Sequence, residues 1–436
     1  MAIGSKIARR SFLQLGAMTV ACAVKGNAQE SPVVPNASTT REKFAAITSA
    51  FTMRSTADNI VTRLLQGYWI GNDYHEPQCD VISLYEDRKE TTSLGPRMSE
   101  VYGITLAHSV SDALTLSRGS LAIDGVVIAC DDEYADAAVA RSSRDLKFRL
   151  FEQVVEVFRK CGRSVPVFCA GRLAAGWDQA KQMQQWSKEL SFPLMSGTST
   201  SVTFRRPDLD YPLPHDFDDA SLGDRAHHDF PLGVDFDEGL VVCPSGPSAV
   251  FCSFEILQAF LERRRTGETG IRSLECLVDE AVWKSARDGR WSTELMRSAL
   301  GRAEALQGGR PEDAQYPAVC LVEYNDGTRS AILSLGGIVN EYLAAFRLKG
   351  RREIDSTLCY TPAGSANDFS MLAEGFLQMV ITGKSPYPVE RNLLTTGAFL
   401  QWLRISGQNG GRIETQELHI AYAAPEHSFY AQCRGW

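Results

Sequence analysis

A regular alternation of short apolar runs and amphipathic stretches between residues 43 and 206 constrains the fold more than any other feature of this chain. Stretches with apolar residues at intervals of three and four predict helices, and the clearest of them covers residues 144–160. Strands that are apolar on both faces and alternate with helices form a parallel sheet that helices cover on both sides. The sequence therefore predicts an α/β domain with a doubly wound parallel sheet. Its six predicted strands are residues 44–51, 81–85, 104–107, 124–130, 165–169 and 192–196.

The second half of the chain has a different pattern. Residues 207–247 hold several prolines and many acids, and we interpret them as a long acidic connection that contains histidines. A helix over residues 251–264 then opens a second domain, predicted to cover residues 248–436. Two apolar runs flank an Asn-Asp-Gly-Thr turn at residues 325–328, which is the strongest hairpin signal in the chain. These features predict an α+β domain with a largely antiparallel open sheet.

The N-terminus has the form of an export signal. Arg9 and Arg10 precede Ser-Phe-Leu and an uncharged stretch that runs to Val24, which is typical of the twin-arginine route for folded proteins. The apolar stretch is shorter than the about 20 residues that span a bilayer. We predict a signal peptide over residues 1–28, a flexible lead-in over residues 29–42, and a periplasmic or secreted mature protein. A basic tail followed by an apolar helix is the alternative interpretation.

The charge balance argues against a polyanionic partner. Without residues 1–28 the 45 basic residues fall to 41 against 53 acidic ones, a formal net charge of −12. Nucleic-acid binding needs a basic face, and the basic run at residues 263–265 is expected at the solvated end of a helix. Nothing beyond the signal predicts membrane binding. A hydrophobic content of 44% and a charged content of 22% are ordinary for a soluble protein of two domains.

Eleven cysteines are spread along the chain without a Cys-x-x-Cys pair. Several lie in apolar, strand-like runs, where a free thiol behaves as a small apolar side chain. We therefore expect most of them to be reduced and buried, although one or two disulfides stay open. Cys243 with Cys252 is the pair to test first.

The turn after the first strand is the expected nucleotide-binding element. An open parallel sheet binds its ligand at the carboxyl ends of its strands, so residues 49–55 of this Rossmann-like domain should face the ligand. The turn lacks Gly-x-Gly-x-x-Gly and offers side chains where the glycines would stand. Ser49, Ser55 and Arg54 are its candidate cofactor contacts. Arg54 is a candidate for a phosphate group, and a solvated surface arginine is the alternative.

Acids at the ends of two further strands complete the candidate cofactor site. Glu86 and Asp87 follow the second strand, where an acid would hold ribose hydroxyls. The alternative for either acid is a surface residue that merely ends a strand. Asp131 follows the strand that ends at Cys130 and is the third candidate.

The order of elements and several local motifs resemble the glucose-fructose oxidoreductase and inositol dehydrogenase superfamily, which joins a Rossmann domain to an α/β domain with a large open sheet. The resemblance covers nearly the whole mature chain, and its motifs are short. Residues 169–174 fall where the family has Glu-Lys-Pro followed by Leu-Ala. Residues 376–384, with Pro386, Ser406 and Gly407, look like the family's closing pattern.

This resemblance implies an enzyme that uses NAD or NADP and acts on a carbohydrate or polyol. It also implies departures, because Gly171 takes the place of the family's catalytic lysine and the helix from Phe251 lacks the family's histidine. Arg172 is kept as a candidate catalytic residue that orients a substrate oxygen, since a guanidinium is a poor proton donor. Departures at the lysine, the histidine and the nucleotide turn put hydride transfer in doubt.

Residues 215–229 contain the densest set of candidate ligands and acid–base groups. His215, His227 and His228 lie there among five aspartates. No spacing in this segment matches a metal signature, so we expect no metal site and interpret the segment as an acidic, hydrated loop. If the loop covers the active site, one of its histidines replaces the missing family residue.

Three functions stay open from the sequence. The first is an exported NAD- or NADP-dependent oxidoreductase that acts on a carbohydrate or polyol. The second is a catalytically degenerate relative that binds carbohydrate or serves as a scaffold. The third is a metal-dependent hydrolase built from the His/Asp loop, although the chain holds no Gly-x-Ser-x-Gly and no His-Glu-x-x-His. The second domain is assigned to substrate binding and oligomerisation, which is compatible with a homo-oligomer.

Overall fold

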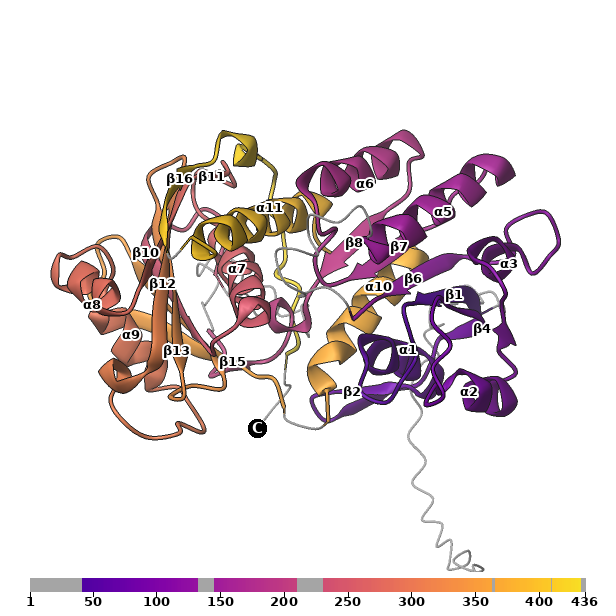
Figure 1. The fold of residues 1–436 in the computed structure, drawn as a ribbon, viewed down its shortest axis with the longest axis horizontal. Coiled ribbons are helices and arrows are strands. Elements are labelled where there is room, and N and C mark those ends of the chain that lie inside the picture. Colours follow the sequence, from indigo (N-terminus) through magenta and orange to yellow (C-terminus); the bar gives the residue numbers. More distant parts are fainter. Residues whose placement is uncertain (1–40, 132–144, 210–229, 363–364, 409, 433–436) are drawn as a thin grey trace, which may run out of the picture. The chain divides into compact units, whose positions relative to one another are not determined.

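Six parallel strands form the first sheet of the computed structural model, which describes residues 41–131, 145–209, 230–362, 365–408 and 410–432 (Figure 1). Their order is β5-β4-β1-β6-β7-β8, so the chain builds one side of the sheet from β1 and then crosses to β6 and builds the other. This doubly wound order confirms the predicted α/β class. The strands are β1 (Glu42–Thr48), β4 (Cys79–Glu86), β5 (Thr105–Leu106), β6 (Gly125–Ala129), β7 (Val167–Ala170) and β8 (Leu194–Gly197).

Helices cover both faces of this sheet, and local capping signals set their ends. Ser55 begins α1 by accepting a hydrogen bond from the Asp58 amide, as predicted, and Gly162 ends α5 in a left-handed conformation. The apolar side chains of α1 pack on one face, and those of α3, α5 and α6 pack on the other. The helices are α1 (Thr56–Gln66), α2 (Gly95–Tyr102), α3 (Val110–Thr115), α5 (Leu146–Cys161) and α6 (Trp177–Glu189).

One helix from the end of the chain also packs on the first sheet. Helix α10 (Ser370–Thr382) follows the second domain in sequence but places Phe376 4.6 Å from Phe44 and 6.1 Å from Phe168, measured between ring centroids. It lies beside β6 and β7 in Figure 1. The sequence prediction had assigned this helix to residues 248–436, because it follows the other elements of that domain. Its aromatic contacts instead make it part of the first domain's core.

The second sheet has eight strands in the order β16-β11-β12-β13-β10-β14-β15-β9. All neighbours are antiparallel except β10 and β13, which confirms a largely antiparallel sheet. The hairpin of β12 and β13 closes on the predicted Asn-Asp-Gly-Thr turn. The strands are β9 (Arg205–Arg206), β10 (Phe236–Cys243), β11 (Ile271–Val278), β12 (Gln315–Tyr324), β13 (Arg329–Gly336), β14 (Tyr342–Leu348), β15 (Ile354–Cys359) and β16 (Gly411–Glu414).

Strand β10 lies inside residues 207–247, which the sequence analysis had interpreted as a connection. Its last residues, 240–243, are apolar and fully buried between β13 and β14. The Pro- and Asp-rich composition of the whole segment obscured this short run. The second domain therefore begins earlier than residue 248.

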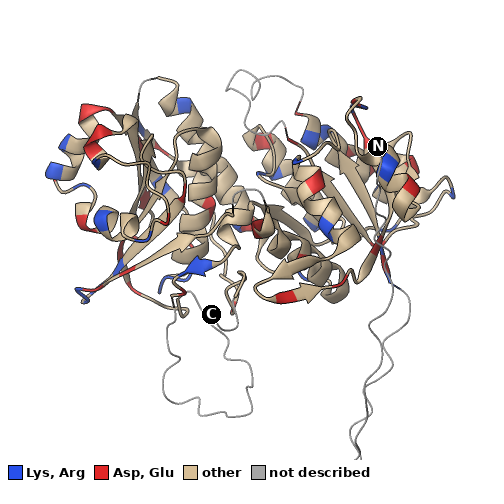
Figure 2. Ribbon diagram, turned by 90° about the horizontal axis from the view of Figure 1, so that it is seen from below, with Lys and Arg blue, Asp and Glu red and all other residues tan. Residues whose placement is uncertain are grey.

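Helices lie on both faces of the second sheet (Figure 1). Helices α7 (Pro247–Leu261) and α11 (Val389–Ser406) pack on one face, and α8 (Glu280–Arg287) and α9 (Thr293–Leu300) pack on the other. Figure 2 shows acidic and basic residues interspersed along the described ribbon. In the same residues, no helix is long and apolar enough to cross a membrane.

The cysteines agree with the expectation of buried thiols. Nine lie in the described ranges, all nine are free, and only Cys161 is not fully buried. Cys243 and Cys252, the pair chosen first for a disulfide, are both free. Burial raises the pKa of the Cys243 thiol to about 12, which keeps it protonated and unreactive.

Candidate functional site

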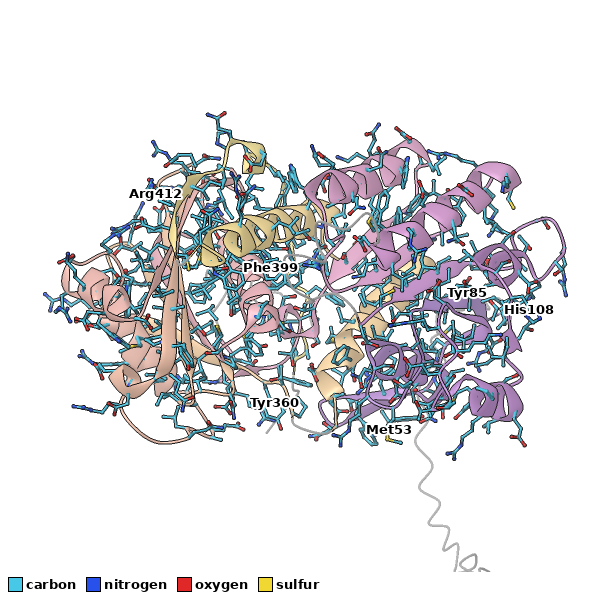
Figure 3. All side chains as sticks on the ribbon, in the orientation of Figure 1. Met53, Tyr85, His108, Tyr360, Phe399 and Arg412 are labelled. Carbon is cyan, nitrogen blue, oxygen red and sulfur yellow. The ribbon has the colours of Figure 1, made fainter. Side chains whose placement is uncertain are left out.

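The candidate site lies at the carboxyl ends of β1 and β6. The strand order reverses between these two neighbours, and open sheets of this type bind ligands at such a point. Ser49, just after β1, is buried, and its hydroxyl accepts a hydrogen bond from the Asp131 amide at 3.3 Å. This bond ties the two strand ends together. Met53, labelled in Figure 3, is 75% exposed in the turn that follows.

The first turn of α1 is held by oxygen atoms of the protein itself. The Asp131 carboxylate accepts a hydrogen bond from the Thr56 amide at 2.7 Å. The Asp58 carboxylate accepts one from the Arg54 amide at 2.8 Å, and the Ser55 hydroxyl accepts one from the Asp58 amide at 3.1 Å. The structure therefore brings four predicted contacts, Ser49, Arg54, Ser55 and Asp131, to one turn.

Glu86 lies next to this turn but faces its backbone. It is 8% exposed, and its carboxylate accepts hydrogen bonds from the Phe51 amide at 3.0 Å and from the Ser93 hydroxyl at 2.8 Å. Gly95 packs so closely that a Cβ atom there would lie 2.3 Å from a Glu86 oxygen. The carboxylate expected to hold ribose hydroxyls is thus enclosed between the turn and the start of α2.

Asp87 points elsewhere, although it follows Glu86 directly. It is exposed and hydrogen bonds with the side chain of Tyr85, which Figure 3 labels. Burial and the Asp87 carboxylate together raise the pKa of Tyr85. Asp87 is the predicted ribose contact that stays open to solvent.

These contacts test whether a dinucleotide fits the turn. A pyrophosphate at a helix N-terminus needs backbone amides that point at the ligand and glycines that let the ligand approach. Here the amides of Phe51, Arg54 and Thr56 are each bound by a carboxylate. The turn has no glycine, and Arg54 itself adopts the left-handed φ of 64° that glycine would favour. The residues present do not fit a dinucleotide bound in this way.

A lysine from α5 lies at the end of β7. The Lys147 ammonium donates hydrogen bonds to the carbonyl oxygens of Ala170 at 2.5 Å and Arg172 at 2.8 Å, on either side of Gly171. Gly171 has a φ of 76° and exchanges two backbone hydrogen bonds of 2.8 Å with Gly197. Burial lowers the pKa of Lys147 to about 8.

Lys147 is not among the site residues predicted from the sequence. One signal marks it, because residue 147 falls on the apolar stripe of the helix, in line with Phe151, Val154 and Phe158. A lysine on a buried stripe must satisfy its ammonium inside the protein, so it merits attention as a charged group at a strand end. Here the carbonyl oxygens at the end of β7 meet that need.

Arg172 extends from β7 toward the second domain. It is 3% exposed, and its guanidinium lies 5.5 Å from the ring centroid of Phe399 on α11, which Figure 3 labels. The next residue, Leu173, donates its amide to the Thr396 hydroxyl at 3.2 Å. The predicted catalytic Arg172 therefore lies in a packed contact between β7 and α11, away from the turn before α1.

Helix α7 carries an acid where the family resemblance led us to look for a histidine. Glu255 is fully buried and accepts hydrogen bonds from the Thr198 amide, the Asn392 amide group and the Thr395 hydroxyl. Burial raises the pKa of Glu255, and the Thr395 hydrogen bond and the Arg391 charge oppose that rise. Two of these partners lie on α11 and the third directly follows β8, so Glu255 holds the packing of α7 against β8 and α11.

The three predicted histidines, His215, His227 and His228, lie outside the described residues. Their part in catalysis stays a prediction. Among the residues that the structure describes, no group of three or more His, Cys, Asp or Glu side chains could hold a metal ion.

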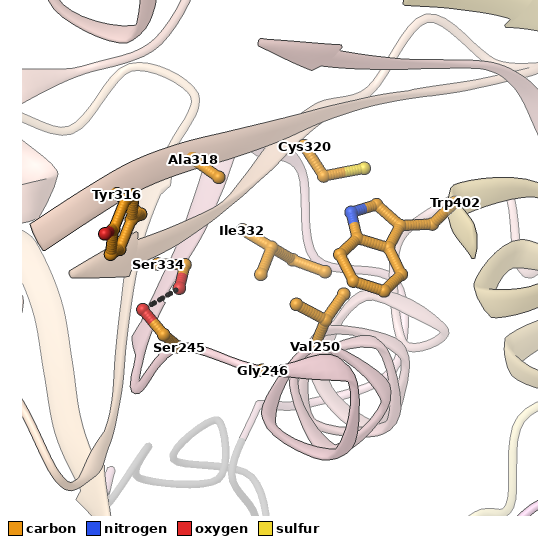
Figure 4. A pocket seen from close by; sticks show the side chains of 9 residues that line it. All are labelled: Ser245, Gly246, Val250, Tyr316, Ala318, Cys320, Ile332, Ser334 and Trp402. Atoms are coloured by element: carbon orange, nitrogen blue, oxygen red, sulfur yellow. Dashed lines mark hydrogen bonds between the residues drawn. The ribbon is translucent and has the colours of Figure 1, made fainter. Parts of the chain in front are cut away.

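A separate pocket of about 220 Å³ lies between the second sheet and helices α7 and α11 (Figure 4). Its one polar pair is Ser245 and Ser334, whose hydroxyls are 3.4 Å apart. No carboxylate, imidazole or amine lines it, and its titratable side chains are the Tyr316 phenol and the buried Cys320 thiol. The lining residues are Ser245, Gly246, Val250, Tyr316, Ala318, Cys320, Ile332, Ser334 and Trp402.

Comparison with known proteins gives likenesses of fold topology only. No protein-family model matches the chain, and no curated protein sequence matches it. The myo-inositol 2-dehydrogenase of Lactobacillus plantarum aligns with 86% of this chain and 99% of its own, at a TM-score of 0.49 and 10% identity. GenD2 from gentamicin A biosynthesis, solved with NAD, aligns over 86% and 96% at a TM-score of 0.49 and 13% identity. A putative NADPH-dependent oxidoreductase of Desulfitobacterium hafniense aligns with 87% of this chain and 99% of its own, at a TM-score of 0.47 and 12% identity.

Similarities this weak do not indicate a function, which must be argued from the residues of this chain. The fold class rests on the strand orders of the two sheets. What those solved proteins bind or oxidise is a property of those proteins.

Proposed function

We propose that this protein binds a neutral carbohydrate or polyol at the carboxyl edge of the first sheet and has lost dinucleotide-dependent hydride transfer. The observation that carries the proposal is that carboxylates already bind three backbone amides at the turn before α1, those of Phe51, Arg54 and Thr56. A pyrophosphate at this helix start would have to displace these carboxylates.

Two further positions support the loss of hydride transfer. Gly171 offers no side chain where the family resemblance implies a lysine, and its φ of 76° is unfavourable for any residue with a Cβ atom. On α7, Cys252 and Ser253 lie in the region where the resemblance implies a histidine, and both are buried. Gly171, Cys252 and Ser253 supply no group that exchanges a proton near neutral pH. Glu255 on the same helix is buried and already accepts hydrogen bonds from Thr198, Asn392 and Thr395.

The carboxylates at the start of α1 favour a neutral ligand over an anion. Asp58 and Asp131 accept hydrogen bonds from amides there, so a phosphate or carboxylate ligand that approaches these amides meets their repulsion, which the exposed Arg54 of the same turn offsets only in part. Each ionised carboxylate has more acceptor sites than its protein donors use, and a ligand hydroxyl can donate to the remainder. A polyhydroxylated ligand supplies many such donors without charge.

Isothermal titration calorimetry of the mature protein tests the proposal. We expect no heat from NAD, NADP or ADP at millimolar concentration and saturable heat from at least one of myo-inositol, scyllo-inositol or glucose. Binding of NAD or NADP in the micromolar range would contradict the proposal. Equally, failure of every polyol and sugar to bind would leave the crevice without its proposed ligand.

A NAD- or NADP-dependent polyol oxidoreductase is the second candidate function. The observation that favours it is Lys147, whose ammonium lies beside Gly171 and whose pKa of about 8 suits a proton-transferring group. Absorbance at 340 nm with the same polyols and NAD or NADP tests it. Turnover that is lost in Lys147→Met and retained in the exposed Lys160→Met would establish this candidate and displace the first.

We also propose export through the twin-arginine route. The support is the order of Arg9, Arg10, the uncharged stretch and the small residues that end at Ala28. Fractionation of the native host should recover the protein outside the cytoplasm. Changing both arginines to lysine should retain it inside, and equal export of that variant would contradict the proposal.

A further inference from the structure

The feature that carries a further inference is the way Asp131 bridges β6 to the start of α1. Its amide donates to the Ser49 hydroxyl at 3.3 Å, and its carboxylate accepts from the Thr56 amide at 2.7 Å. The backbone and the side chain of Asp131 thus connect the end of β6 to the end of β1 and to the start of α1. Its carboxylate lies on the N-terminal axis of an 11-residue helix, where the backbone dipoles favour an anion.

We propose that Asp131 is the residue that determines ligand charge at this site, because its carboxylate occupies the position at α1 where a ligand phosphate would bind. The inference rests on the proposed absence of a dinucleotide. It goes further, since it assigns the exclusion of phosphate to one side chain and states that removing that side chain reverses it.

Two effects make the Asp131 carboxylate an effective block. It already accepts the hydrogen bond of the Thr56 amide, so a phosphate would have to displace it there. It is also a negative charge, so a phosphate that binds beside it meets Coulomb repulsion in addition. Asp58, in the first turn of α1, adds to that repulsion because its carboxylate is bound to the Arg54 amide at the same turn.

A cation stands next to the blocked position. Arg54 belongs to the same turn and is exposed. In the present structure its backbone amide is bound by Asp58, while its side chain extends from a left-handed backbone position at a φ of 64°. With the Asp131 charge removed, a phosphate at the start of α1 has a guanidinium within the same turn, which is a strong phosphate partner.

Three variants separate occupancy from charge. Asp131→Asn keeps an oxygen that can accept from the Thr56 amide but removes the charge, and Asp131→Gly removes both. We expect the affinity for inorganic phosphate and for ADP, measured by calorimetry, to rise by about tenfold in Asp131→Asn and by more in Asp131→Gly. Adding Arg54→Met to Asp131→Gly should reverse most of the gain.

The matched control is Asp112→Asn. Asp112 lies in the first turn of α3, and its carboxylate accepts a hydrogen bond from the His108 amide at 3.1 Å, so this variant makes the same charge change at another helix start. It should leave phosphate and ADP binding at the wild-type level. Circular dichroism and thermal unfolding of each variant confirm that the comparison is between folded proteins.

The outcomes separate this inference from the proposed function. If a polyol binds the wild type but neither folded Asp131 variant gains affinity for phosphate or ADP, the role of Asp131 is refuted and the polyol proposal stands. If the Asp131 variants gain affinity for phosphate or ADP and no polyol binds the wild type, the role of Asp131 stands and the polyol proposal is refuted. An equal gain in Asp112→Asn would reduce the effect to net charge and also overturn the inference, as would micromolar ADP binding by the wild type.

Discussion

Two regions of this molecule hold charged side chains in opposite ways. At and just after the end of α7, buried charges face opposite charges. Arg391 on α11 bonds to Glu262, with both side chains 3% exposed or less, and Arg264 bonds to Glu268 at 2.8 Å. At the crevice edge of the first sheet, charges face the backbone instead, as Asp131 does at the Thr56 amide.

The difference changes what each charge can do. Burial alone would lower the pKa of Arg391, but the Glu262 carboxylate outweighs it and holds that pKa above its usual value. Lys147 is buried against carbonyl oxygens, and its pKa falls to about 8. Buried ion pairs such as Arg391 and Glu262 stabilise the packing of helices. The hydrogen bonds of Lys147 and Asp131 described above go to backbone groups, and these two side chains can still change protonation state or repel a ligand.

Arg391→Met should show the largest effect, because it leaves Glu262 buried without its cation. We expect the free energy of unfolding to fall by about 3–5 kcal/mol, measured by urea denaturation. Arg265→Ala is the control, since its bond to Asp235 is exposed and should contribute less than about 1 kcal/mol. Similar losses in the two variants would remove the distinction between buried and exposed pairs.

Lys147→Met should change the pH dependence of stability. The folded-state pKa of about 8 lies below the ordinary lysine pKa of 10.5, so between these values the unfolded chain binds the extra proton and stability rises with pH. From pH 7 to pH 10 the wild type should gain about 2–3 kcal/mol in unfolding free energy relative to Lys147→Met. Urea denaturation at the two pH values measures this, with Lys160→Met as the control. If the difference in unfolding free energy between wild type and Lys147→Met is the same at pH 7 and pH 10, the Lys147 amine is not desolvated.

Gly171→Ala tests the backbone at the end of β7. A residue with a Cβ atom at a φ of 76° should lower the unfolding free energy by about 1–2 kcal/mol. Gly103→Ala is matched to it, because Gly103 has a φ of 70° and nothing within 4 Å of its added Cβ atom. A larger loss at Gly171 than at Gly103 would show that the bridge to Gly197 adds a constraint beyond local strain.

Asp131→Asn should have the smallest effect on stability. The asparagine oxygen still accepts from the Thr56 amide, so we expect a change of less than about 1 kcal/mol in thermal or urea unfolding. A loss near that of Arg391→Met would mean that the crevice charges support the fold as strongly as the buried pairs do.

Sequence patterns predicted the features that neighbouring residues decide. The Asn-Asp-Gly-Thr turn specified the β12–β13 hairpin, and Ser55 marked the start of α1. They did not reveal which side chain would meet which backbone group across the sheet. Glu86 was placed at the correct strand end, but its bond to the Phe51 amide depends on a turn that is distant in sequence. The burial of Lys147 depends likewise on the end of β7.

The position of α10 late in the chain affects how the protein is made. All six strands of the first sheet leave the ribosome well before Phe376, the side chain that covers Phe44 and Phe168. During synthesis that aromatic surface stays uncovered until most of the chain has emerged, and exposed apolar surface of this kind promotes aggregation. We therefore expect that the N-terminal half alone, without α10, does not yield a stable fragment.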